Sequence, residues 1–82
     1  MSFREQAEQV LAGLGGKENI TEMEPCVTRI RVEVSDDSKV DDAALRQAGA
    51  FGVMRMGKAI RVILGPQADN IEAEIRKIME GS

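Results

Sequence analysis

The first hydrophobic residues of the chain recur every three or four positions, which is the spacing of one face of a helix. They are Phe3, Ala7, Val10, Leu11 and Leu14. Ser2 is suited to cap the first turn, and the pair Gly15-Gly16 can adopt the left-handed conformation that ends a helix. The pattern therefore predicts an amphipathic helix between Ser2 and these glycines.

From Thr28 the hydrophobic period becomes two, which is typical of a half-buried strand. The stretch before it, "KENITEMEP", is predicted to be a turn followed by a short extended piece. One side of the strand consists of Thr28, Ile30, Val32 and Val34. The other consists of Val27, Arg29, Arg31 and Glu33. The strand thus has an apolar side for the core and a polar side for solvent.

The second half of the chain predicts a helix, a hairpin and a final helix. "DDAALRQAG" reads as a short helix capped by Asp41 or Asp42 and ended by Gly49. "FGVMRMGKAIRVILG" reads as a hairpin with a tight Gly57-Lys58 turn of type II′. We expect one side of it to hold Met54, Met56, Ile60, Val62 and Leu64, and the other to hold Val53, Arg55, Arg61 and Ile63. "PQADNIEAEIRKIME" carries a helical apolar stripe.

The order of these elements is helix, strand, strand, helix, strand, strand, helix. It predicts an α+β fold in which the helices gather on one face of a mainly antiparallel sheet and leave the other face open. The length of 82 residues fits one domain spanning residues 1–82. The apolar residues are accounted for by a single core, so a monomer is expected.

The amino-acid composition excludes several classes of activity and partner. The formal net charge is −3, and the chain has one cysteine and no histidine, tryptophan or tyrosine. These are too few ligands for a metal cage, so neither a metal nor a cofactor is expected, and no Ser-His or Cys-His hydrolase can be assembled. The acidic balance and the shortage of aromatic rings argue against nucleic-acid partners. No apolar run is long enough for membrane insertion, so a cytoplasmic protein is expected.

Alternation along the strands predicts a cluster of positive charge. If the helices cover the apolar side, the open sheet face carries Arg29, Arg31, Arg55 and Arg61, next to Cys26. Guanidinium forks bind phosphate or carboxylate oxygens through paired hydrogen bonds. For any single arginine, a solvated side chain paired with a glutamate is the simpler interpretation. The four together beside the only cysteine favour an anion site.

Cys26 is the candidate nucleophile of this site. Pro25 disfavours a central strand position, so the thiol is expected at a turn or edge, and the nearby arginines favour its thiolate. A cysteine phosphatase needs an arginine where Val32 stands, and thioredoxin-type exchange needs a second cysteine. A nucleophile beside cations fits phosphoryl transfer to sulfur. A redox-sensing cysteine without a resolving partner stays open.

Three stretches, "LGGKENI", "CVTRIRVEVSDDSKVDDAALRQAGAFGV" and "ILGPQADNIEAEI", resemble the enzyme IIB domain of the sugar phosphotransferase system, glucose/glucoside superfamily. The resemblance covers about residues 7 to 79. Its most specific part is Cys-x-Thr-Arg-[Leu/Ile]-Arg followed by Asp-x-Ser-Lys-Val-Asp. It implies a two-layer α+β sandwich, with a four-stranded antiparallel sheet and three helices on one side.

The resemblance also implies an activity, which is that of a bacterial phosphotransferase. Such domains accept a phosphoryl group from a phosphohistidine of enzyme IIA and pass it to a sugar held by the membrane enzyme IIC. Carried over, Cys26 is the phosphorylated residue, and Arg29 and Arg31 bind the phosphoryl oxygens and assist onward transfer. Thr28 belongs to the phosphate-binding motif. Its position on the apolar side of the predicted strand nevertheless predicts a structural role. The implied sugar is glucose, N-acetylglucosamine or a glucoside, and the implied place is the inner face of the cell membrane, reached through enzyme IIC.

One position departs from the family. Many members read Gly-Val-Gln-x-Ile-Phe-Gly in the last strand, whereas "AIRVILG" places Arg61 where a phosphate-contacting glutamine is common. A third guanidinium can hold phosphocysteine more tightly and slow its transfer, because ground-state binding does not lower the barrier. Arg61 can also pair with an acidic residue of a partner. An alternative function therefore stays open, that of a non-catalytic IIB-like regulatory module that binds phosphorylated or anionic partners. An RNA-binding domain that uses the arginine face conflicts with the acidic balance.

Overall fold

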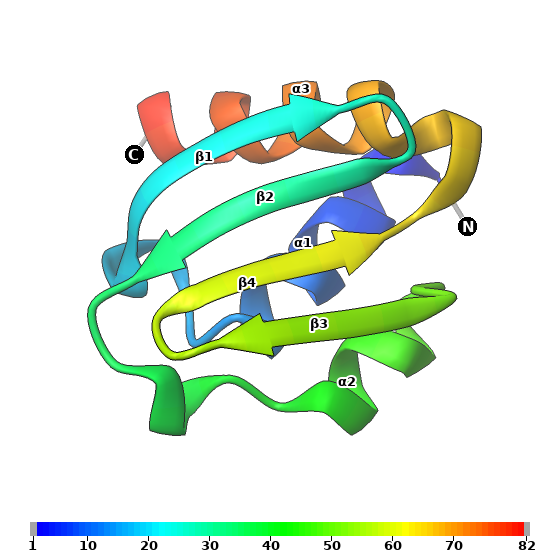
Figure 1. The fold of residues 1–82 in the computed structure, drawn as a ribbon. Coiled ribbons are helices and arrows are strands. Elements are labelled where there is room, and N and C mark those ends of the chain that lie inside the picture. The colour runs from blue at the N-terminus through cyan, green and yellow to red at the C-terminus, as the bar shows by residue number, and fades with distance from the viewer. Residues whose placement is uncertain (1, 82) are drawn as a thin grey trace.

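Two β-hairpins build the sheet in the computed structural model, which describes residues 2–81 (Figure 1). The first hairpin consists of β1 (Ile20–Cys26) and β2 (Arg29–Val34), and the second of β3 (Gly52–Met56) and β4 (Ala59–Ile63). The strand order is β1-β2-β4-β3, and every neighbouring pair is antiparallel. The strand β1, which ends at the cysteine, is therefore an edge of the sheet.

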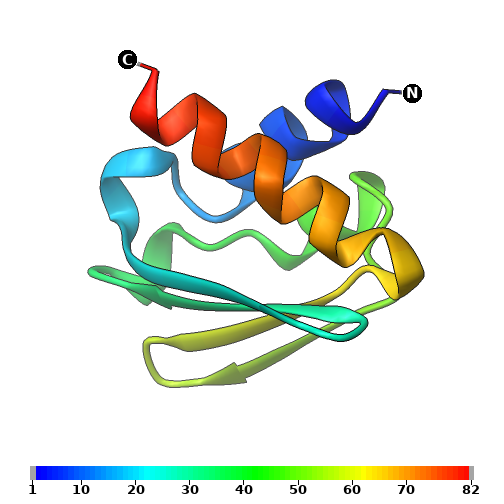
Figure 2. The same ribbon diagram turned by 90° about the horizontal axis from the view of Figure 1, so that it is seen from above.

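Three helices lie on the same side of this sheet (Figure 2). They are α1 (Phe3–Gly13), α2 (Asp42–Gln47) and α3 (Ala68–Glu80). Single 3₁₀ turns occupy Lys17–Asn19, Asp37–Lys39 and Gly65–Gln67. The caps follow the sequence, since Ser2 Oγ accepts a hydrogen bond from the Glu5 amide and Asp41 Oδ1 accepts one from the Ala44 amide. The α+β class and the layer arrangement are confirmed.

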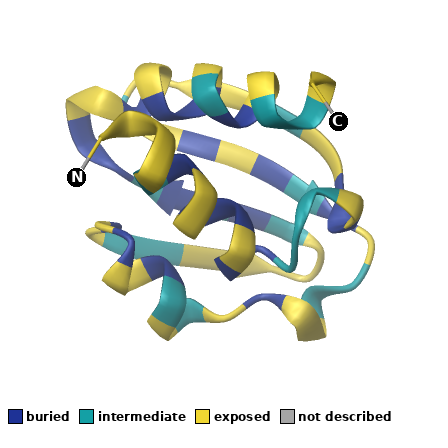
Figure 3. Ribbon diagram, turned by 180° about the vertical axis from the view of Figure 1, so that it is seen from behind, coloured by how far each residue is buried: buried dark blue, intermediate teal, exposed yellow. Residues whose placement is uncertain are grey.

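The core fills the space between the helices and the inner sheet face (Figure 3). Along the two central strands, Ile30, Val32, Ile60 and Val62 are fully buried. They alternate with exposed or half-buried residues, as the period of two requires. At the edge, Arg76 of α3 donates a hydrogen bond of 2.8 Å to the carbonyl of Met23 in β1. The helices thus cover one side of the sheet and leave the other open.

Both hairpins close through two-residue turns in which only the first residue has a positive φ. The first turn has Val27 at φ 59° followed by Thr28, and the second has Gly57 at φ 62° followed by Lys58. This is the pattern of the type II′ turn, where glycine is the preferred first residue. A β-branched valine in that conformation is under backbone strain, and it directly follows the cysteine.

The expectation that Arg55 lies on the open face with Arg61 is wrong. The Gly57-Lys58 turn pairs Met56 with Ala59, so Met54 lies opposite Arg61 and Arg55 lies opposite the buried Ile60. Directly opposed residues in antiparallel strands point to the same side. The side chain of Arg55 therefore turns to the helix side. There it donates to Asp42 Oδ1 at 3.2 Å and to the carbonyl of Asp37.

Candidate functional site

Strand register gathers the candidate residues on the open sheet face. Cys26 at the end of β1 lies directly opposite Arg29 at the start of β2. One step further from the turn, Glu24, Arg31 and Arg61 lie in a row across β1, β2 and β4. Side chains directly opposite one another are about 5 Å apart at Cβ, and diagonal neighbours remain within reach of an arginine. Cys26, Arg29, Arg31 and Arg61 therefore form one cluster.

The cysteine is presented by the turn that follows it. Its side chain is exposed, as expected from Pro25 and from the edge position of β1. The carbonyl of Thr28 accepts hydrogen bonds from the amides of Leu64 (2.9 Å) and Gly65 (3.0 Å), which anchor the turn to the end of β4. Thr28 thus lies in the turn, where its backbone fixes the cysteine in space.

The three arginines of the open face differ in their partners. Arg31 forms an ion pair with Glu24, with Nη1 and Oε1 3.4 Å apart. Within residues 2–81, the guanidinium groups of Arg29 and Arg61 have no hydrogen-bond or ion-pair partner. The simpler interpretation, a glutamate pair at the surface, therefore describes Arg31, whereas Arg29 and Arg61 are available to an anion.

Large apolar side chains border this cluster on the β3 side, and the sequence pattern did not predict them there. Met54 and Met56 share the open face with Arg61, and their exposed fractions are 44% and 60%. Val27, at the tip of the cysteine turn between β1 and β2, is also exposed, at 82%. Counting residues through the two-residue turn would have placed both methionines outside. The open face thus combines a positive centre with an apolar border.

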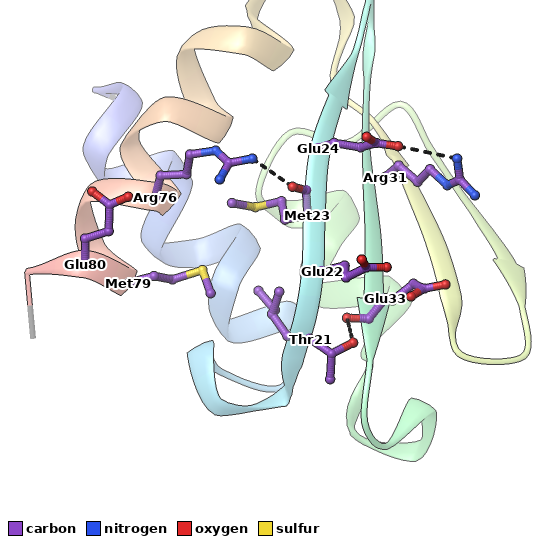
Figure 4. A pocket seen from close by; sticks show the side chains of 10 residues that line it. Thr21, Glu22, Met23, Glu24, Arg31, Glu33, Arg76, Met79 and Glu80 are labelled. Atoms are coloured by element: carbon purple, nitrogen blue, oxygen red, sulfur yellow. Dashed lines mark hydrogen bonds and ion pairs between the residues drawn. The ribbon is translucent and has the colours of Figure 1, made fainter.

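An acidic region borders the cluster on the β1 side. Glu22 lies opposite Glu33 on the open face, and a hydrogen bond to that second carboxyl, together with its like charge, raises the pKa of Glu22 above its ordinary value of 4.5. These residues line a depression of about 600 Å³ that follows β1 towards Arg76 and Met79 of α3 (Figure 4). From β1 to β3, the open face is therefore first acidic, then positively charged, and finally apolar.

The chemistry of this cluster is that of an exposed sulfur nucleophile beside cations. Within the described part of the chain, no three His, Cys, Asp or Glu side chains are grouped as a metal site. No helix between residues 2 and 81 is long and apolar enough to span a membrane. Free guanidinium groups next to a thiol suit an incoming group that carries several anionic oxygens. The fold and the site define an α+β domain whose open sheet face sets an exposed cysteine beside arginine side chains.

Comparison with known proteins agrees with this class. The family described as phosphotransferase system, EIIB, matches residues 8–41. The N-acetylglucosamine-specific EIIB component of the PTS system from Streptomyces coelicolor is 54% identical over 74 residues, which are 90% of this chain and 96% of that protein. A solved structure, one domain of the PTS system IIabc component from Clostridium difficile, is 28% identical with a TM-score of 0.79, and the match covers 93% of this chain and 81% of that one.

The chain therefore belongs to the EIIB family of the sugar phosphotransferase system, in the glucose superfamily. It is a phosphotransferase component. The expected family and fold are confirmed, whereas the roles of individual residues follow as proposals.

Proposed function

We propose that the chain carries a phosphoryl group on Cys26 between enzyme IIA and a sugar bound to enzyme IIC. The observation that carries this proposal is the register that sets the exposed thiol opposite Arg29, with Arg31 and Arg61 in the next row. Membership of the EIIB family supports both partners. The domain associates with the inner face of the membrane through enzyme IIC and not by inserting into the bilayer.

The first transfer forms a bond between phosphorus and sulfur. The Cys26 thiolate attacks the phosphorus of the phosphohistidine, the P–N bond breaks, and the histidine leaves with the electron pair. Arg29 and Arg31 bind the equatorial oxygens as charge develops on them. The open sheet face suits this step, because an approaching protein meets no helix in front of the thiol.

The second transfer reverses the role of sulfur. A sugar hydroxyl attacks the phosphocysteine, the P–S bond breaks, and the thiolate is regenerated. Histidine, the commonest general base, is missing from this chain, and we assign the base that takes the hydroxyl proton to the enzyme IIC side. We propose N-acetylglucosamine as the sugar, because the Streptomyces coelicolor relative is specific for it.

Reconstituted sugar phosphorylation tests the proposal. Membrane vesicles that contain enzyme IIC, a charged enzyme IIA and this domain should phosphorylate labelled N-acetylglucosamine faster than labelled glucose. Cys26→Ser should stop the reaction and leave the fold unchanged, because the side chain is exposed. Equal sugar phosphorylation with and without the thiol would remove Cys26 from the mechanism. A preference for glucose would refute the sugar assignment alone.

The alternative, a regulatory module that binds phosphorylated partners, draws on Arg61. This guanidinium lies directly opposite Arg31 and has no partner within residues 2–81. A domain that binds a phosphorylated protein but passes no phosphate to sugar would favour this second function.

A further inference from the structure

Among residues 2–81, Glu24 is the one acidic residue of the open face that lies beside both the thiol and an arginine of the cluster. It lies two residues before Cys26 on the same side of β1, so the two Cα atoms are about 7 Å apart. Directly across, its carboxylate contacts the Arg31 guanidinium at 3.4 Å (Figure 4). Arg31 is diagonal to Cys26, close enough for its long side chain to reach either group.

Arg31 therefore has two anions within reach at different stages of the cycle. Before phosphorylation, the carboxylate of Glu24 is its partner, and the side chains of the pair are 52% and 63% exposed. A pair this exposed is weak and exchanges readily. A phosphoryl group on sulfur carries close to two negative charges and three acceptor oxygens, so it competes well for the same guanidinium. Arg61 lies directly opposite Arg31 on β4, and the two like charges repel each other. An anion close to both guanidinium groups relieves this repulsion.

We propose that Glu24 is a positioning residue that holds Arg31 in the thiol form and competes for it with the phosphoryl group. This inference rests on the proposed phosphorylation of Cys26. In the phosphorylated state, the carboxylate of Glu24 competes with the phosphoryl group for Arg31. This competition weakens the ground state of phosphocysteine. A less stable ground state favours onward transfer to sugar, since binding that is stronger in the ground state does not accelerate the step.

The structure offers a matched control for this residue. Glu22 has the same side chain on the same strand and the same face, two residues further from Cys26, and its neighbour across the strand is Glu33 instead of an arginine. Glu24→Gln and Glu22→Gln therefore remove the same charge at different distances from the site.

The test measures how the phosphoryl group distributes at equilibrium between a charged enzyme IIA and the domain, by intact mass. Glu24→Gln should shift the distribution towards phosphocysteine by about three- to tenfold, the size expected for one nearby charge. Glu22→Gln should produce a clearly smaller shift, because Glu22 also feels the charge of Arg31 but lies further from the thiol and has Glu33 as its neighbour across the strand. The shift should shrink at high salt, which screens exposed charges, and in an Arg31→Gln background, because Glu24 acts through Arg31. Onward transfer to sugar should slow in Glu24→Gln.

A second readout needs no partner protein. In the resting domain, Glu24→Gln frees Arg31 to stabilise the thiolate, so iodoacetamide should alkylate Cys26 about two- to threefold faster at fixed pH and low salt. A wild-type distribution and a wild-type alkylation rate in Glu24→Gln would overturn the inference while phosphorylation of Cys26 still held. An effect that persists in full without Arg31 would overturn the positioning role. Wild-type domain that accepts no phosphate at Cys26 would overturn the proposed function and this inference with it.

Discussion

Val27 is the residue whose replacement gives the sharpest prediction about stability. It is the first residue of the cysteine turn, its φ is 59°, and its side chain is 82% exposed. A left-handed conformation costs a residue with a Cβ about 1–2 kcal/mol. Glycine removes that cost and adds roughly 0.5–1 kcal/mol of chain entropy to the unfolded state. Because the valine buries little surface, Val27→Gly should stabilise the domain by about 0.5–1 kcal/mol.

The second hairpin provides the reverse experiment. Gly57 occupies the same turn position at φ 62°, and a Cβ added there meets nothing within 4 Å. Gly57→Val therefore introduces the strain without a clash, and it should destabilise the domain by about the same amount that Val27→Gly stabilises it. Thermal and urea unfolding followed by circular dichroism measure both changes, with an expected Tm shift of about 2–8 °C in opposite directions. A Val27→Gly variant with unchanged or lower stability would refute the strain argument, and so would a neutral Gly57→Val.

Three further predictions concern the open face. Arg29→Lys and Arg31→Lys keep the charge but lose the guanidinium fork, so the rate of phosphoryl transfer to sugar should fall by about tenfold or more in each variant. Rapid-quench kinetics measure this rate, and unchanged rates in both variants would remove the arginines from the mechanism. Arg61→Gln should speed transfer without loss of Cys26 labelling if the guanidinium overstabilises phosphocysteine, and an equal or slower rate would exclude that braking role. Because Glu33 raises the pKa of Glu22 in the folded state, protonation of Glu22 stabilises the fold below its ordinary pKa of 4.5, and this stabilisation is lost as the pH rises through the folded pKa. Glu22→Gln should therefore raise the Tm at pH 7, with the gain disappearing below pH 4.5; an equal gain at both pH values would contradict the carboxyl pair.

The sequence alone was sufficient to predict the elements that have a clear hydrophobic period or a helix cap. The period of two placed β2 from Arg29 to Val34 and its buried side correctly, because the buried side of that strand is entirely aliphatic. The same pattern was wrong for Val27 and Thr28, which form the turn between β1 and β2. Ser2 and the pair Asp41-Asp42 marked the starts of α1 and α2, and the structure selects Asp41 as the cap of α2. Such side chains satisfy amides that the helix leaves free. The α+β class followed from the order of the predicted elements, and the family resemblance followed from the motif that begins at Cys26.

The hairpin at Gly57 shows why the rest was not predicted. Hydrophobicity suggested that Met54 and Met56 face the core with Ile60, yet the two-residue turn fixes the register independently of hydrophobicity. The methionines are on an edge strand and can remain exposed, whereas Arg55 reaches Asp42 on the helix side. Turn geometry outweighs side-chain type in this hairpin.

The partners of the arginines also depend on three-dimensional contacts. Sequence alternation placed Arg29, Arg31 and Arg61 on one face correctly. It did not say which of them a glutamate would occupy, because strand pairing selects Glu24 for Arg31 among several nearby glutamates. The strained turn at Val27 was likewise hidden, since nothing in the residue itself signals a positive φ.

Mass spectrometry of the domain after incubation with a charged enzyme IIA tests the central claim most directly. The account predicts a gain of one phosphoryl group, located by fragmentation on Cys26 and absent from Cys26→Ser under the same conditions. A phosphoryl group found on another residue, or an equal gain in Cys26→Ser, would contradict the assignment of Cys26 as the carrier.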